Sequence, residues 1–312
     1  MSHSLLAVFF GLLSSLTIAW GTVVRHNVAG GVTVEEKSSG AAAKAMAGKP
    51  IWWAGTFLAL LGYALQVVAL GFGTLLIVQP MLVLSLVFTL PLSAWTSGRR
   101  ISKAETCWAL LLSLAVAVLV LVGRPTAGVI HPPLSRWIPA LAIGIVTLFL
   151  LDRYAHTQLR RRKAVILGIV TGGIYGYVAL LSKAVTDRLV HDGISELLAS
   201  WELWALIAGA VIGTVVQQSS FSAGALKHSL PAMTIVEPIV AFGLGYAVLG
   251  ESFAVQGIGW LVLFAALATM VVAAILLSRH SVDEPTTIQL TNRSQHTSGE
   301  QSSNPESTKQ AA

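Results

Sequence analysis

The chain alternates long apolar stretches with short polar segments. A helix needs about 20 mainly apolar residues to cross the hydrocarbon core of a bilayer, and nine stretches of the chain qualify. The pattern therefore predicts nine transmembrane helices, of which the fifth is the shortest: Leu5–Val24, Trp52–Gly71, Leu75–Trp95, Thr106–Val122, Trp137–Leu151, Ala164–Val185, Leu203–Phe221, Leu230–Leu249 and Ile258–Leu277.

Two longer segments do not follow this pattern. The segment His26–Lys49 combines Gly, Ala and Ser with charges of both signs, which predicts a loop with room for a short surface helix. The segment Arg279–Ala312 is rich in Ser, Thr, Gln and Asn and has few apolar residues. Such a segment cannot bury a core, so it predicts a disordered tail.

Composition excludes an ordinary soluble domain. Of the 312 residues, 54% are hydrophobic and 11% are charged, and the mean hydropathy is +0.74, whereas a soluble chain carries roughly 25% charged residues. The net charge of +6 resides in short segments between apolar runs. It is therefore interpreted as a signal of membrane topology rather than of nucleic-acid binding. The single cysteine, Cys107, has no companion for a disulfide within the chain or for a metal site.

The distribution of basic residues predicts the orientation. The segments after odd-numbered helices, together with the tail, hold 16 of the 20 Lys and Arg residues. Because basic residues accumulate on the cytoplasmic side, the N-terminus is expected outside and the tail in the cytoplasm, with the protein in the cell membrane.

The chain also repeats itself. A shift of 151 positions without a gap aligns the second and third helices with the seventh and eighth, and a shift of 157 aligns the first helix with the sixth. An offset of five helices reverses the direction of the chain, so helices 1–4 and 6–9 are predicted to be inverted repeats, an architecture of many secondary transporters. The matched pairs are Trp53 and Trp204, Gly62 and Gly213, Gln66 and Gln217, Gly73 and Gly224, Pro80 and Pro231, and Trp20 and Tyr177.

The repeat divides the chain into four predicted parts. Residues 1–123 form a first transmembrane repeat, and residues 124–162 form a connecting helix with a basic cytoplasmic loop. Residues 163–278 form the second repeat, and residues 279–312 form the tail. The expected fold is thus all-α and polytopic, with two inverted four-helix repeats joined by a central helix.

Several short motifs are shared by the two halves or lie at helix ends: Gly11-Leu-Leu-Ser-Ser, Trp52-Trp53-Ala-Gly, Val78-Gln79-Pro80, Gly168–Lys183, Val236-Glu237-Pro238 and Leu249-Gly250-Glu251. In these motifs the chain resembles the drug/metabolite transporter superfamily and its EamA-like members. The resemblance covers about residues 5–278 and implies a transporter. Most members of the superfamily have ten helices, and the nine predicted here are closest to the NIPA-type magnesium transporter branch.

Glu237 is the leading candidate for a functional site. It lies about 12 Å along the eighth helix from its cytoplasmic end, at 1.5 Å per residue, and hence near the bilayer midplane. A charge at that depth costs at least about 2.5–3.5 kcal/mol, and such residues commonly mark a substrate pathway or a proton relay. The alternative is a protonated side chain that hydrogen-bonds to a neighbouring helix.

Other polar side chains in the predicted helices offer two interpretations each. Gln217 and Ser220 share one face of the seventh helix, and Gln66 is the repeat partner of Gln217; they either line a cavity or join helices. Lys183, near the outer end of the sixth helix, either extends to the interface or acts as a gate or counter-ion.

Aromatic residues of the first and sixth helices complete the candidate site. Trp20, Tyr175 and Tyr177 could wall a cavity and hold a cation against their rings. Gly172 and Gly173, in contrast, are expected to serve close helix packing.

The sequence contains no constellation that indicates an enzyme, a cofactor site or a P-loop. The leading hypothesis is a secondary transporter for a small metabolite or cation. Three alternatives stay open: a NIPA-like route for divalent cations, in which Glu237 would bind the metal; a lipid-linked sugar flippase; and a membrane scaffold without transport. The fourth and ninth helices have few polar groups, so they are expected to face lipid or a second protomer in a homodimer.

Overall fold

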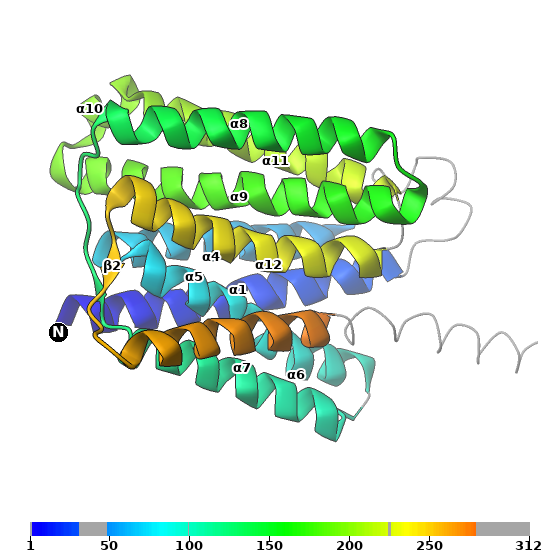
Figure 1. The fold of residues 1–312 in the computed structure, drawn as a ribbon. Coiled ribbons are helices and arrows are strands. Elements are labelled where there is room, and N and C mark those ends of the chain that lie inside the picture. The colour runs from blue at the N-terminus through cyan, green and yellow to red at the C-terminus, as the bar shows by residue number, and fades with distance from the viewer. Residues whose placement is uncertain (1, 31–48, 99, 224–225, 279–312) are drawn as a thin grey trace, which may run out of the picture.

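The computed structural model describes residues 2–30, 49–98, 100–223 and 226–278 (Figure 1). Within these residues, nine helices are long and apolar enough to cross a membrane, which confirms the predicted all-α, multi-pass architecture. The elements are α1 (Ser2–Gly30), α4 (Pro50–Phe72), α5 (Leu75–Val83), α6 (Ser85–Ser97), α7 (Lys103–Leu121), β1 (Pro125–Thr126), α8 (Leu134–His156), α9 (Arg160–His191), α10 (Ile194–Ala199), α11 (Trp201–Ala223), α12 (Leu226–Leu244), the π-helical turn η1 (Gly245–Leu249), β2 (Ser252–Phe253) and the helix Gly259–Ser278.

Some boundaries differ from the sequence-based expectation. The fifth spanning helix, α8, is a full 23 residues long rather than the shortest, because its polar ends stay helical beyond the apolar run. Helix α1 continues to Gly30, past the expected start of the loop at His26. The remainder of that predicted loop and the predicted tail lie outside the described residues.

A two-stranded antiparallel ribbon, which the sequence pattern does not predict, joins the two halves. Pro125 of β1 pairs with Phe253 of β2, and Thr126 pairs with Ser252. The ribbon lies at the end of the bundle where α1 begins and where α10 is found (Figure 1). We call this end, which carries β1, β2 and α10, the ribbon end, and the opposite end, where α1 finishes and α9 begins, the far end.

Glycines set the distance between the first two helices of each half. A Cβ atom added to Gly62 of α4 would lie 2.5 Å from Cγ1 of Ile18 on α1, and one added to Gly21 would lie 3.3 Å from Cβ of Leu58. These separations are too short for a larger side chain. Helix α1 therefore packs along α4 with almost no intervening side-chain layer.

The second half uses the same device between α9 and α11. A Cβ atom on Gly213 would lie 2.9 Å from Cε1 of Tyr175, and one on Gly209 would lie 3.2 Å from Cγ2 of Val178. Helix α9 is thus held against α11 by small residues on α11.

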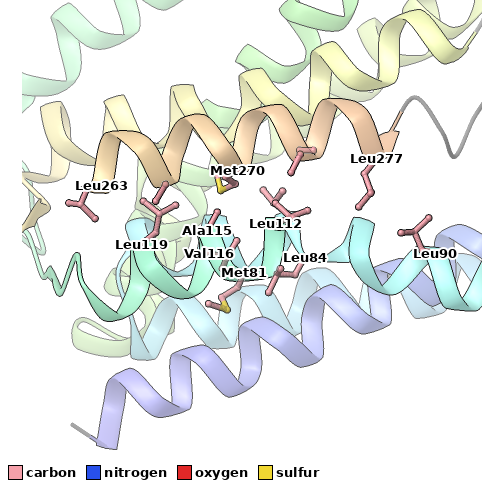
Figure 2. Close-up of a cluster of buried hydrophobic side chains, with 14 residues drawn as sticks. Met81, Leu84, Leu90, Leu112, Ala115, Val116, Leu119, Leu263, Met270 and Leu277 are labelled. Atoms are coloured by element: carbon pink, nitrogen blue, oxygen red, sulfur yellow. The ribbon is translucent and has the colours of Figure 1, made fainter. Parts of the chain in front are cut away.

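The largest apolar cluster lies where α7 and the helix Gly259–Ser278 meet each other and the helices α5 and α6 (Figure 2). Leu112 and Leu119 of α7 are buried against Met270 and Leu277. The fourth and ninth spanning helices therefore pack face to face, while exposed residues such as Leu114 cover the opposite face of α7. The contact of those outward faces with lipid or with a second protomer stays a prediction.

Candidate functional site

Helix α12 carries Glu237 into the middle of the bundle. Two glycines of α9 allow the α12 backbone to approach closely: a Cβ atom on Gly172 would lie 2.8 Å from the Met233 carbonyl oxygen, and one on Gly176 would lie 3.1 Å from the Glu237 carbonyl oxygen. The expectation that Gly172 serves packing is consistent with this contact. The spacing of Gly172 and Gly176 fixes the height of Glu237 against α9.

Polar side chains of three further helices are linked to Glu237 by electrostatic interaction, or to one another by a hydrogen bond. The Tyr175 hydroxyl of α9 donates a hydrogen bond to Oε1 of Gln217 on α11, with an O···O distance of 3.1 Å. Tyr63 of α4 lies within electrostatic range of both Glu237 and Tyr175. We refer to Tyr63, Tyr175, Gln217 and Glu237 as the central polar group.

The side chains of the central polar group are not fully buried in the protein. Tyr63 keeps 57% of its surface exposed, and Tyr175, Gln217 and Glu237 are each only partly buried. Within the described part of the chain, the Glu237 carboxyl has neither a hydrogen bond nor an ion pair. A carboxyl in this setting has its full capacity to bind a cation or a proton.

Among the described residues, the other predicted site residues make no hydrogen bond or ion pair with the central polar group. The Tyr177 hydroxyl donates to the Ala140 carbonyl oxygen of α8 at 2.6 Å, and the Ser220 hydroxyl donates to the Ala164 carbonyl oxygen of α9 at 3.1 Å. Gln66 is buried on α4, one turn after Gly62, and Trp20 is 46% exposed on α1. The structure therefore links Tyr175 with Gln217 and Glu237, whereas the hydroxyls of Tyr177 and Ser220 bond to backbone carbonyl oxygens instead.

Lys183 belongs to a second polar region, at the ribbon end. Its Nζ atom pairs with Oδ1 of Asp187 at 2.7 Å and donates to the Leu70 carbonyl oxygen of α4 at 2.8 Å. The side chain is 13% exposed, so it is held inside the protein instead of extending to the interface. We refer to Lys183, Asp187 and Glu251 as the ribbon-end charge network.

Glu251 forms the most unusual contact of this network. Its Oε1 accepts from the backbone N–H of Leu75 at 2.9 Å, and its Oε2 accepts from the N–H of Leu76 at 3.0 Å. These N–H groups are the first two of α5, which have no partner within that helix. Glu251, buried to 1% exposure, therefore caps a helix of the other half of the chain.

Local backbone geometry delivers this carboxylate. The π-helical turn η1 ends at Gly250, whose φ of 73° lies in the left-handed region that favours glycine. The Glu251 N–H then bonds to the Gly245 carbonyl oxygen at 3.0 Å. A Cβ atom on Gly245 would lie 3.4 Å from Oε2 of Glu251, in van der Waals contact, so the carboxylate packs directly against this residue.

The electrostatics of Glu251 reflect its burial. Burial raises the pKa of Glu251 to about 7, while the N–H groups of Leu75 and Leu76 and the charge of Lys183 lower it and Asp187 raises it further. The buried charge is thus only partly compensated by its partners.

Sequence reasoning missed Tyr63 and Asp187 and assigned no contact to Glu251. Asp187 follows Lys183 by four residues on one helix, and that spacing was a usable signal for an ion pair. Tyr63 has no such signal, since only the tertiary packing of α4 brings it towards Glu237.

The fold and this site define a multi-pass α-helical membrane protein with a polar group in the middle of its bundle. The chain is 52% identical over 281 residues to an uncharacterized protein of Corynebacterium glutamicum, and the match covers 90% of this chain and 97% of that protein. The chain therefore belongs to the same family as this corynebacterial protein. No protein-family model matches the chain, and no solved structure matches it.

Proposed function

We propose that the protein is a secondary transporter of the drug/metabolite transporter superfamily, which moves a small metabolite or cation by alternating access. The observation that carries the proposal is the composition of the central polar group. Tyr63 comes from the first half of the chain, whereas Tyr175, Gln217 and Glu237 come from the second. A substrate site between two halves near the midplane is the arrangement of many secondary transporters.

The packing inside each half supports the inverted repeat. Under the shifts of 157 and 151 positions, the contact between Ile18 and Gly62 corresponds to that between Tyr175 and Gly213. The contact between Gly21 and Leu58 corresponds in the same way to that between Val178 and Gly209. Two equivalent contacts, made by residues that the sequence alignment pairs, favour a common four-helix unit.

The charge distribution supports an orientation. Sixteen of the 20 Lys and Arg residues lie in the segments that follow odd-numbered helices, and the described ones among them, such as Arg100, Arg153 and Arg162, are at the far end (Figure 1). We therefore place the far end in the cytoplasm and the ribbon end outside.

The chemistry of the central polar group favours a positively charged substrate. The Glu237 carboxylate supplies a negative charge, and the rings of Tyr63 and Tyr175 can attract a cation through their π-faces. A proton would compete with the substrate for the same carboxylate. The protein then exchanges substrate for protons across the membrane if it changes conformation only when the carboxylate has bound either the substrate or a proton. It must not change conformation while the carboxylate is charged and empty.

The test is transport by purified protein in proteoliposomes, with a panel of cationic, zwitterionic and anionic metabolites and Mg²⁺. Glu237→Gln keeps the shape and removes the charge, so it should abolish proton-coupled transport without loss of expression. Glu237→Asp should keep part of the activity with a shifted pH optimum. Glu196→Gln, at an exposed position of α10, is the matched control and should behave as wild type. Full activity of Glu237→Gln at every pH would contradict the proposal.

A further inference from the structure

We infer that Glu251 is a latch that closes the ribbon end, and that Thr74 takes its place as the cap of α5 when the latch opens. This inference rests on the proposed transport function, because alternating access requires each end of the bundle to open in turn.

The latch joins the two halves at a single turn. Glu251 follows η1 in the second half and binds the N–H groups of Leu75 and Leu76 in the first half, across 176 and 175 residues of sequence. Lys183 of α9 binds the Leu70 carbonyl oxygen on the other side of the same turn. The ribbon end cannot open between these halves unless both contacts break.

The close approach of α4 and α9 at this level supports the same conclusion. A Cβ atom on Gly71 would lie 3.4 Å from Cγ2 of Thr186. Together with the Lys183 contact to Leu70, this places the end of α4 directly against α9.

Thr74 provides the alternative cap. It occupies the N-cap position of α5, with extended φ and ψ of −82° and 158°, yet its side chain makes no capping hydrogen bond. A threonine in this position normally accepts a hydrogen bond from an N–H of the first turn. Its Oγ1 atom is instead buried without a partner among the described residues.

The two caps therefore exclude each other. While Glu251 holds the first N–H groups of α5, Thr74 Oγ1 is left without a hydrogen bond, at a cost. When Glu251 withdraws, the N–H groups become free, and Thr74 needs only a side-chain rotation to accept from the first turn. Both states of α5 are then capped, which is the property of a two-state element.

A second buried glutamate shows what an ordinary cap looks like. Glu105 of α7 is 2% exposed, and with Ser102 it forms a capping box inside its own helix. It caps three residues away in sequence, and it caps the same helix. Glu251 differs because its capping bond is also a bond between halves.

The experiment measures from which side the middle of the bundle can be reached. In a Cys107→Ser background, Gln217→Cys is labelled with a membrane-impermeant maleimide added to one side only. Gln256→Cys, in the exposed segment after β2, and Thr157→Cys, between α8 and α9, serve as references for the ribbon end and the far end.

The expected effects have opposite signs. Glu251→Ala removes hydrogen bonds to a charged group from the closed form alone and so shifts the equilibrium towards the open form. Labelling from the ribbon end should therefore rise by about tenfold. Thr74→Val, which keeps the shape and removes the hydroxyl, should lower it by about threefold, since the open form loses its cap. Glu105→Ala is the matched control and should leave the ratio between the two sides unchanged.

Hydrogen exchange of the Leu75 and Leu76 amides measures directly whether Glu251 protects them. Glu251→Ala should accelerate exchange of these amides, and Thr74→Val should not. Unchanged exchange in Glu251→Ala would overturn the latch, and so would faster exchange without any change in side preference, which would mark Glu251 as a static cap. If Gln217→Cys resists labelling from both sides in every variant, the proposed transport function itself fails.

Discussion

The central polar group and the ribbon-end charge network both carry acidic side chains inside the apolar bundle, and the surroundings of these side chains differ. At the ribbon end, Asp187 is paired with Lys183 at 2.7 Å, and Glu251 accepts two backbone hydrogen bonds. In the middle, Glu237 has neither an ion pair nor a hydrogen bond within the described residues. A buried charge that has bonding partners contributes to holding the structure, whereas a carboxylate without a partner is available to bind a cation or a proton.

The largest expected effect separates the two regions by stability. Lys183→Met leaves Asp187 buried and unpaired, at 11% side-chain exposure. The thermal unfolding of the purified protein in detergent should show a loss of about 3 kcal/mol. Glu237→Gln, which breaks no pair, should leave the unfolding temperature unchanged or slightly raised.

A double variant checks the physical cause. Lys183→Met combined with Asp187→Leu removes both charges and should recover most of the lost stability, since an apolar pair replaces an unpaired charge. If the double variant is as unstable as Lys183→Met alone, the packing of Lys183 rather than its charge holds the ribbon end.

A smaller effect distinguishes two tyrosines of one helix. Tyr175→Phe removes the hydrogen bond to Gln217 in the central polar group and should change the apparent substrate affinity several-fold with little effect on unfolding. Tyr177→Phe removes the bond to Ala140 and should cost about 1 kcal/mol of stability while transport stays intact. Equal effects of both variants on transport would remove Tyr175 from the proposed site.

A further expected effect concerns pH. The pKa of Glu251 is raised to about 7 in the closed form, and a carboxyl exposed by opening would titrate near about 4.3. The closed form thus binds the proton more tightly, so its advantage is complete below about pH 4.3 and is lost as pH rises through about 7. Labelling of Gln217→Cys from the ribbon end should therefore be faster at pH 8 than at pH 5.5.

The pH experiment needs two controls. Division by the labelling rate of Gln256→Cys removes the effect of pH on the thiol itself. Lys183 and Asp187 interact with this carboxyl, and Arg136 lies beside the preceding residue, Gly250, so Glu251→Gln isolates the part of Glu251 and should abolish the pH dependence. A dependence that persists in Glu251→Gln belongs to one of the neighbouring groups.

The sequence predicts the helices far better than the contacts between them. Apolar length alone is sufficient for nine spans, since a bilayer imposes one dimension on every helix. The same pattern cannot show that the polar ends of α8 remain helical or that Pro125 pairs with Phe253, because neither depends on hydrophobicity.

Of the residues in the candidate site, some could likewise be predicted from the sequence and others could not. Glu237 was predictable because a carboxylate in an apolar run is conspicuous. Tyr63 was not, since an aromatic residue in a spanning helix is ordinary until packing shows what it approaches. The partner of Glu251 is a backbone amide, and every residue except proline has one, so no sequence pattern could identify Leu75 and Leu76.

Helix α8 has a consequence for how such a protein arises and changes. Only 11% of its apolar stretch is buried, and Trp137 and Gly144 are among its few buried positions. In the proposed repeat, duplication of a four-helix unit alone would give two copies in the same direction, and one extra crossing makes them antiparallel. The main duty of α8 is then to return the chain to the other face of the bilayer. Among related proteins, most surface positions of α8 should accordingly vary in sequence. The position of Gly144, which contacts the ring of Tyr177, should vary little.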